Sequence, residues 1–144
     1  MSSNVHFSSQ TDLWASPEWF VQQCRIEFGE FDLDPAANAE NAKAERFFTK
    51  EDNGLSQNWN ADRVWLNPPY GRVIKDWIAK ALHEYDQGRA KKIMMLLPAR
   101  TDTRWFWSFY ERTDVEVRFI KGRLKFGGSK NSAPFPSMLV IIGA

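Results

Sequence analysis

The sequence predicts an α/β domain built on a mostly parallel sheet with a C-terminal antiparallel hairpin. Apolar runs of strand length alternate with amphipathic helical segments, which is the pattern of βαβ units. Two apolar runs near the C-terminus lie close enough along the chain to pair antiparallel. The chain has 144 residues, 43% of them hydrophobic, which is enough for one core and leaves little room for a second. We therefore expect one domain over residues 1–144.

The first third of the chain predicts one helix and one short strand. Ser16 as N-cap and Pro17 as first helical residue begin a helix, and apolar residues recur with helical spacing until Gly29. Residues 31–33 predict a short strand that ends before a proline. Residues 38–54 mix helix-forming residues with an Asp-Asn-Gly turn, so they predict either a short helix or a loop.

The rest of the chain alternates strands and helices. Between residues 74 and 85, apolar side chains recur at i, i+3, i+4, i+7, i+8 and i+11, which predicts a helix, and Gly88 follows as its C-terminal glycine. The other expected elements are strands at 63–66, 92–99, 115–120, 123–126 and 138–143 and a helix at 102–112.

Charge and cysteine content exclude several classes of protein. The net charge is only +1, although basic residues outnumber acidic ones from Arg89 onward and the reverse holds for the first 62 residues. Cys24 is the single cysteine, and His6 and His83 are far apart, so we expect neither a disulfide framework nor a metal site. No signal peptide or membrane-spanning run is visible. A cytoplasmic protein is expected.

Polar or proline-containing segments follow three of the predicted strands. They are Asp34-Pro35, Asn67-Pro68-Pro69-Tyr70 and Pro98-Ala99-Arg100. In parallel α/β sheets, ligands bind beyond the carboxyl ends of the strands. The sequence therefore predicts a functional site at that edge.

The segment Asn67–Tyr70 has the chemistry of a clamp for an amine. Two consecutive prolines fix the backbone, so the Asn67 side-chain oxygen and the Pro68 carbonyl can both accept hydrogen bonds from one exocyclic NH₂ group. Tyr70 offers a flat face for a base, and such stacking is worth about 1–3 kcal/mol. The alternative is a turn that only ends the strand.

Six segments in order resemble a known family. They are DLWASPEWF, FDLDPAAN, EDNGL followed by Trp59, VWLNPPYG, MMLLPARTDTRWF and FIKGRLKF, and together they span about residues 11–142. This set resembles the phage-type DNA N6-adenine methyltransferases, the Dam-like family. The resemblance implies a Rossmann-like, S-adenosylmethionine-dependent methyltransferase fold and methyl transfer to the amine of an adenine flipped out of DNA.

The resemblance also implies roles for individual residues. Asn67 and the Pro68 carbonyl would accept hydrogen bonds from adenine N6, Pro69 would stiffen the corner, and Tyr70 would stack on the base. The cofactor S-adenosylmethionine would contact Ser16, Pro17, Asp34, Pro35, Ala36, Asp52 and Asn67. The loop after Pro35 lacks the glycines usual in such folds, and Glu45 is the candidate for a ribose-binding acid. As alternatives, Asp34 caps a turn and Asp52 is an ordinary turn residue.

Basic residues downstream of strand ends predict the DNA contacts. A phosphate backbone would pass there if a base entered the clamp. The expected residues are Arg72, Lys75, Arg100, Arg104 and Arg123, with Phe126 beside the flipped base and Lys125 and Lys130 in the same basic region. Solvated surface side chains are the alternative for each cation.

Two other functions fit parts of the sequence. A protein-glutamine methyltransferase would also hold an NH₂ group in an Asn-Pro-Pro-Tyr corner, but such enzymes usually carry a glycine-rich loop and an additional N-terminal helical domain. A non-catalytic DNA-binding module with a degenerate methyltransferase fold is the second alternative. The sequence does not predict the target DNA sequence or the oligomeric state.

Overall fold

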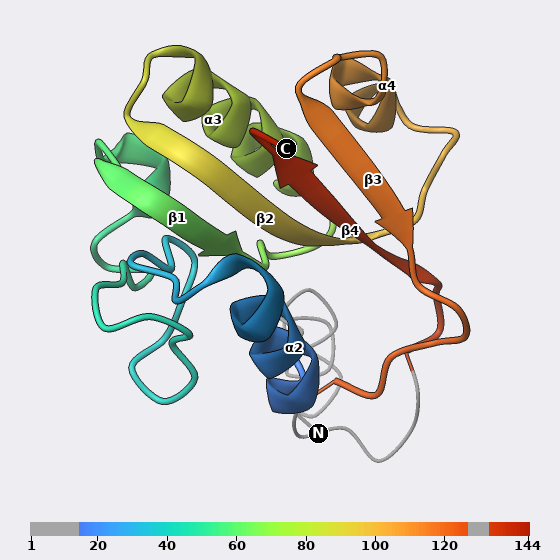
Figure 1. The fold of residues 1–144 in the computed structure, drawn as a ribbon, viewed down its shortest axis with the longest axis horizontal. Helices are drawn as coiled ribbons and strands as arrows, with labels where there is room; N and C mark the ends of the chain where they lie inside the picture. The colour runs from blue at the N-terminus through green and yellow to red at the C-terminus, as the bar shows by residue number, and fades with distance from the viewer. Residues whose placement is uncertain (1–14, 127–132) are drawn as a thin grey trace, which may run out of the picture.

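The computed structural model describes residues 15–126 and 133–144, which form helices on both faces of a four-stranded sheet (Figure 1). In chain order the elements are α2 (Glu18–Phe28), the 3₁₀ helix η1 (Gly54–Ser56), β1 (Ala61–Leu66), α3 (Ile74–Asp86), β2 (Ala90–Pro98), α4 (Arg104–Tyr110), β3 (Val115–Phe119) and β4 (Ser137–Ile142). The predicted α/β class is confirmed.

The sheet has the order β1-β2-β4-β3, and it is not mostly parallel as predicted. β1 and β2 pair parallel, whereas β4 pairs antiparallel with both β2 and β3. Helical crossovers through α3 and α4 leave β1, β2 and β3 running in the same direction. β4 then enters between β2 and β3 in the opposite direction, which replaces one parallel pairing with two antiparallel ones.

The predicted strand at 123–126 is absent, so the C-terminal hairpin was assigned to the wrong partner. β4 pairs with β3 and β2, and both of its edges are therefore occupied. Leu124 and Phe126 are buried against the α2 side of the sheet within a loop, where the Leu124 carbonyl accepts a hydrogen bond from Ala133 N–H at 2.8 Å. The apolar pattern of this segment reflects packing on the sheet and not pairing within it.

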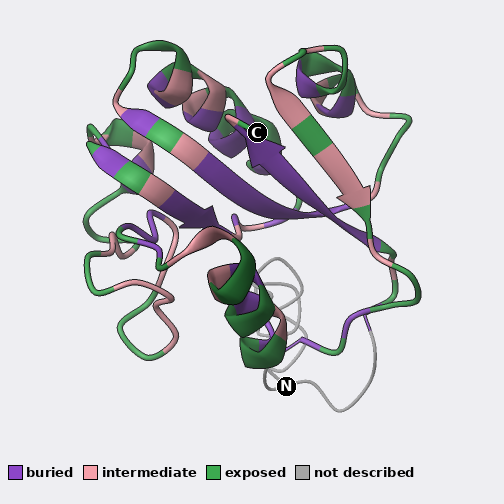
Figure 2. Cartoon of the chain, viewed as in Figure 1, coloured by how far each residue is buried: buried purple, intermediate pink, exposed green. Residues whose placement is uncertain are grey.

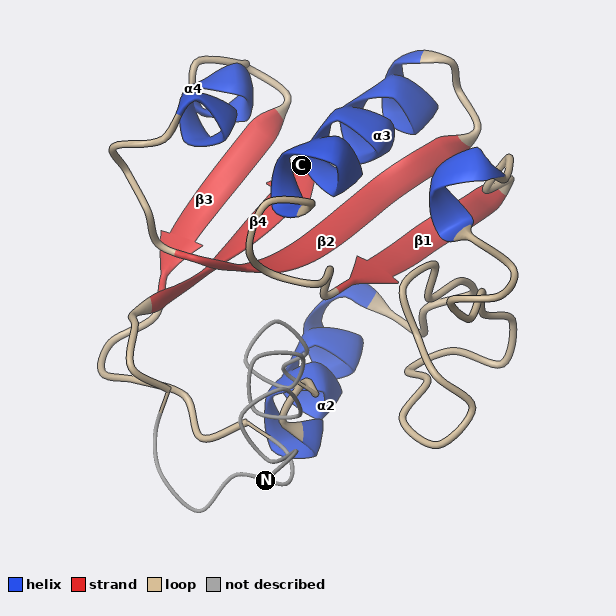
Figure 3. Cartoon of the chain, turned by 180° about the vertical axis from the view of Figure 1, so that it is seen from behind, coloured by secondary structure: helices blue, strands red, loops and turns tan. Residues whose placement is uncertain are grey.

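Side chains alternate between two cores, one on each face of the sheet. Val64, Ile93 and Val140 belong to the core under α3 and α4, while Trp65, Met94 and Ile141 belong to the core under α2. Figure 3 shows α3 and α4 together in front of the sheet with α2 beyond it. β4 is buried along its whole length and β2 along most of it (Figure 2), which explains their continuous apolar runs.

The N-terminal elements differ in detail from their predictions. α2 begins at Glu18 with Pro17 as its N-cap and has no side-chain cap. Ser16, which was predicted to be the N-cap, therefore does not fill that position. The expected strand at 31–33 is reduced to an isolated parallel bridge between Leu33 and Val64. Residues 38–53 form turns and loop, one of the two predicted outcomes, and η1 begins at Gly54.

The remaining helices and strands at 63–66, 74–85, 92–99, 102–112, 115–120 and 138–143 are confirmed within a few residues at each end. Among the residues that the structure describes, none of the helices has the length and apolar character that a membrane span requires.

Candidate active site

Three chain segments finish at the same end of the sheet. Leu33 bridges Val64 in parallel, and β1 pairs with β2 in parallel. The carboxyl ends of these three extended segments therefore lie at the same end of the sheet. Asp34, Asn67 and Ala99 are the residues next to or following those ends. The polar segments singled out from the sequence therefore meet along one side of the molecule.

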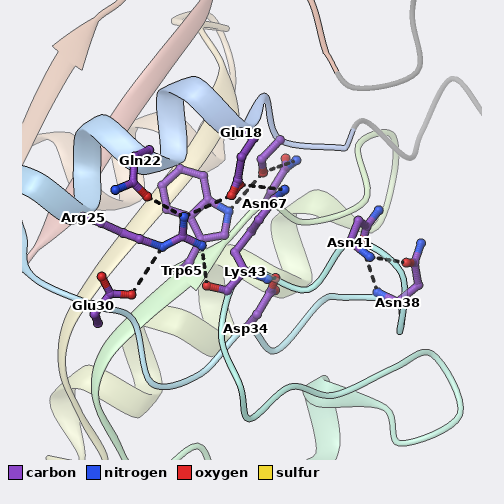
Figure 4. Close-up of polar contacts among 11 residues, drawn as sticks. Glu18, Gln22, Arg25, Glu30, Asp34, Asn38, Asn41, Lys43, Trp65 and Asn67 are labelled. Carbon is purple, nitrogen blue, oxygen red and sulfur yellow. Dashed lines mark hydrogen bonds and ion pairs between the residues drawn. The ribbon is translucent and has the colours of Figure 1, made fainter.

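Asn67 is held by a hydroxyl that lies 51 residues earlier in the chain. Its Nδ2 donates to Ser16 Oγ at 3.0 Å, and the indole Nε1 of Trp65 donates to the same oxygen at 3.0 Å. Ser16 is 6% exposed and Trp65 is fully buried. One buried hydroxyl, two residues before α2, thus holds a side chain of β1 and the side chain that directly follows this strand; Figure 4 labels both, Trp65 and Asn67. The bond from Nδ2 to Ser16 sets the orientation of the amide, and the amide oxygen, which is the acceptor end of this side chain, is buried.

Tyr70 closes the corner against the neighbouring strand. Its hydroxyl donates to the Leu96 carbonyl of β2 at 3.1 Å, and its ring meets Phe135 edge-on with 5.5 Å between centroids. The ring is 5% exposed, and burial raises the pKa of the phenol above its usual range. The segment is therefore anchored at both ends, by the bond of Asn67 to Ser16 and by the bond of Tyr70 to Leu96, and Pro68 is buried between them.

Asp34 organises the loop that follows it. The carboxylate is 4% exposed; its Oδ2 accepts from Lys43 N–H at 2.9 Å and its Oδ1 accepts from Ala36 N–H at 3.4 Å. Burial raises the pKa of Asp34 to about 6, and the two backbone donors oppose that rise only in part. The turn-capping alternative is thus realised in the structure, and it leaves a buried carboxylate whose ionisation a nearby cation would favour.

The far side of this loop is bound to α2 by an ion-pair cluster that sequence reasoning missed. Arg25 Nη2 donates to the Lys43 carbonyl at 2.9 Å, while Arg25 Nη1 bonds Glu18 Oε1 at 3.0 Å. Lys43 Nζ lies 3.6 Å from Glu18 Oε2. Figure 4 shows these groups beside Asp34. The residues are 7 and 18 positions apart in sequence, so only the fold reveals the cluster.

The Asp-Asn-Gly turn packs directly on the backbone of Pro35. A Cβ atom at Gly54 would collide with the Pro35 carbonyl oxygen and would lie 3.0 Å from the Trp77 ring. Glycine is needed here because of this close approach, and the preceding Asn53 adopts φ 56°. Asp52, in contrast, is exposed and accepts from Thr49 N–H at 2.9 Å, so its carboxylate serves the local turn.

Within the described part of the chain, the basic residues predicted to contact DNA lie on the surface. Lys75 and Arg104 stand in the first turns of α3 and α4, the helices that follow β1 and β2, and they line an open groove of about 550 Å³ between these helices. A second depression lies near Asp62 and Arg89, at the opposite edge of the sheet. Neither contains residues Asn67–Tyr70. Among the predicted DNA contacts, the residues with exposed side chains are Arg72, Lys75, Arg100, Arg104, Arg123 and Lys125.

The structure brings some predicted residues together and separates others. Ser16 bonds Asn67, and Figure 4 shows Asp34 beside them; Pro17 and Pro35, which follow Ser16 and Asp34 in the chain, are buried. Phe126 is 1% exposed within the core under α2, with its ring 6.0 Å from that of Phe135. Glu45 is exposed on the loop. Lys130 lies outside the described residues, and the described part of the chain contains no cluster of metal-ligating side chains.

Comparison with known proteins gives concordant matches. A family model described as DNA N-6-adenine-methyltransferase (Dam) matches residues 3–142. A protein of Escherichia phage T1 named DNA N-6-adenine-methyltransferase is 38% identical over 96 residues, 66% of this chain and 39% of that protein. A protein of Haemophilus phage HP1 with the same name is 31% identical over 143 residues, 92% of this chain and 79% of that protein. The chain therefore spans about two fifths of the first relative and most of the second.

Proposed function

The chain belongs to the DNA N-6-adenine-methyltransferase (Dam) family, and on that premise we propose that it transfers a methyl group from S-adenosylmethionine to the exocyclic amine of adenine in DNA. The observation that carries the proposal is the buried link between Ser16 Oγ and Asn67 Nδ2 at 3.0 Å. It directs the NH₂ group to Ser16 and so sets the orientation of the amide; the oxygen is buried, and it would accept from the amine once a base has entered the site.

The residues of the site fit the proposed cofactor. S-adenosylmethionine supplies an electrophilic methyl group on a sulfonium and carries a further positive charge on its amino group. Asp34 is a buried carboxylate with a raised pKa, and a cation beside it would stabilise the ionised form. Each carboxylate oxygen has more than one acceptor position, so the bonds to Ala36 and Lys43 leave capacity for a ligand.

Catalysis then depends on how the chain positions the amine. The Asn67 amide oxygen and the Pro68 carbonyl would accept the two N–H groups of adenine N6, and this pairing would orient the nitrogen lone pair for transfer. Alignment of this kind accounts for a large share of the rate in group transfer, and the spare proton leaves after transfer without a general base of shifted pKa.

Tyr70 has a more restricted role than an open stacking platform. Because its ring is 5% exposed and its hydroxyl is bound to Leu96, base stacking requires neighbouring side chains to uncover one face of the ring. We propose that Tyr70 both anchors the corner to β2 and forms the inner wall against which the flipped base rests.

The exposed cations at the starts of α3 and α4 suit the DNA backbone. Lys75 and Arg104 follow β1 and β2, so they lie on the side of the sheet where Asn67 is placed. Phosphates that flank a base bound at Asn67 would meet these side chains together with Arg72 and Arg100. Replacing one such cation is expected to weaken binding evenly across DNA sequences and to reduce its salt dependence.

A methyl-transfer assay tests the proposal directly. Labelled S-adenosylmethionine is offered with DNA, RNA and a glutamine-bearing protein in parallel. We expect label on adenine N6 of DNA and a loss of about 100-fold or more in Asn67→Ala, in which the acceptor is gone. Asn58→Ala is the matched control, because it makes the same change at an exposed position. Label confined to protein or to RNA would reject DNA as the substrate, and cofactor binding without any transfer would indicate an inactive module.

A further inference from the structure

The strand β3 (Val115–Phe119) forms an open edge of the sheet. Among residues 15–126 and 133–144, β4 is the one strand paired with it (Figure 1). An open edge presents unpaired backbone donors and acceptors, and proteins usually block such an edge or use it for pairing. The side chains of β3 are half-buried or exposed, and Phe119 is 58% exposed.

The register with β4 determines which backbone groups of β3 face outward. Gly143 N–H bonds the Asp114 carbonyl at 2.8 Å, and Ile120 N–H bonds the Ser137 carbonyl at 3.0 Å. Antiparallel strands alternate hydrogen-bonded and non-bonded pairs, so Glu116 and Arg118 also direct their backbone groups toward β4. The N–H and C=O groups of Val115, Val117 and Phe119 consequently point away from the sheet.

We propose that two copies of this chain associate through their β3 strands, antiparallel and around a twofold axis at Val117. In this register Val117 pairs with Val117 of the second copy, and Val115 pairs with Phe119 of the second copy. These are the residues whose backbone groups face outward, so each pair exchanges its hydrogen bonds. The exposed Phe119 ring is then covered by a valine.

Charge complementarity selects this register. Glu116 falls opposite Arg118 of the second copy, and the twofold axis repeats the pair. Both are non-hydrogen-bonded positions, where side chains approach most closely. A shift by two residues would place Glu116 opposite Glu116, or Arg118 opposite Arg118, and like charges directly opposite each other are unfavourable. Shifts by one residue fail because the outward backbone groups no longer meet.

Arg118 is already held in place by two carboxylates of its own chain. Its Nη1 and Nη2 donate to the two Glu27 carboxylate oxygens at 2.7 Å each, and its Nε donates to Glu116. A guanidinium has five N–H donors, so two remain for the carboxylate of a second copy. The side chain therefore loses little freedom on association.

Sedimentation velocity over about 1–200 µM protein tests the proposal, since a short strand interface is expected to be weak. The wild-type chain should show a monomer–dimer equilibrium. Glu116→Arg and Arg118→Glu should each weaken self-association at least tenfold. An equimolar mixture of the two variants should recover it, because every cross-strand pair in the mixed dimer again joins opposite charges. Circular dichroism of each variant checks that the fold is retained.

A proline at Val117 provides a second test that does not alter charge. The Val117 N–H points outward, so Val117→Pro removes no bond to β4 but blocks the edge. Val117→Thr is the matched control, because it keeps the N–H. Loss of the dimer in Val117→Pro but not in Val117→Thr supports the proposal. A wild-type chain that is monomeric throughout the range, or a dimer that survives both the charge reversals and Val117→Pro, would overturn it.

Discussion

Replacing Ser16 with alanine tests how the candidate site is held together. The hydroxyl accepts from Trp65 Nε1 and from Asn67 Nδ2, both at 3.0 Å, and alanine removes this acceptor without adding bulk. The indole N–H of the fully buried Trp65 is left without its partner, and Asn67 loses the bond that sets its amide orientation. One change should therefore reduce both stability and methyl transfer.

The two effects differ in size and can be measured separately. An unsatisfied buried donor costs about 1–3 kcal/mol, which for a chain of this length corresponds to a decrease in melting temperature of roughly 3–10 °C. Misorientation of Asn67 should lower kcat about tenfold or more, equivalent to roughly 1.4 kcal/mol in the barrier. Ser16→Thr keeps the hydroxyl and should remain close to wild type in both measurements.

A double-mutant cycle with Trp65→Phe checks the cause. Phenylalanine removes the indole N–H, so Ser16→Ala should cost much less stability in that background than in the wild type. The full cost in both backgrounds would refute a role for the Trp65 bond. Unchanged kcat in a folded Ser16→Ala protein would refute the positioning of Asn67 by Ser16.

Two further predictions concern the loop that carries Asp34. The pKa of Asp34, about 6, lies above the ordinary value of 3.8. Between these two pH values the folded state therefore keeps a proton that the unfolded chain has already released. Stability should therefore fall as pH rises from about 4 to about 6, by up to about 3 kcal/mol from the 1.4 kcal/mol of each pKa unit; chemical denaturation should show this slope in the wild type and not in Asp34→Asn, and equal slopes would contradict it. For the close packing on Pro35, Gly54→Ala should destabilise by about 1–3 kcal/mol through overpacking. Gly88→Ala, where a Cβ meets nothing within 4 Å but φ is 76°, should cost only about 1 kcal/mol; thermal melts compare the two, and equal losses would show that contact with Pro35 is not the cause.

The sequence predicted the elements of this fold better than their pairing. Periodicity located α3 and β2 well, because amphipathic spacing and continuous apolar runs are local signals. The position of β4 between β2 and β3 depends on contacts more than 40 residues apart, such as Met95 with Val140, and no local pattern encodes them. The segment at 123–126 has strand-like alternation because one of its faces is buried in a loop.

The site shows the same limit. Asn67 and Asp34 were predicted from their positions after strands, and the structure places both at one edge of the sheet. Ser16 was predicted as a helix cap, because Ser-Pro before an amphipathic run is a capping pattern, yet its hydroxyl is used by Trp65 and Asn67. Gly54 was overlooked beside Asp52, since its close approach to Pro35 becomes visible only in three dimensions.

The central position of β4 has a consequence for how the chain folds. β1, α3 and β2 follow one another closely, so this unit can form early at low entropic cost. The outer edge of β2, from Ile93 to Leu97, then stays unsatisfied until a segment some 40 residues later has been synthesised and captured. During that delay the nascent protein carries a methionine- and leucine-rich ribbon that is open to wrong partners, and its yield in the cell should depend on chaperones that shield this ribbon.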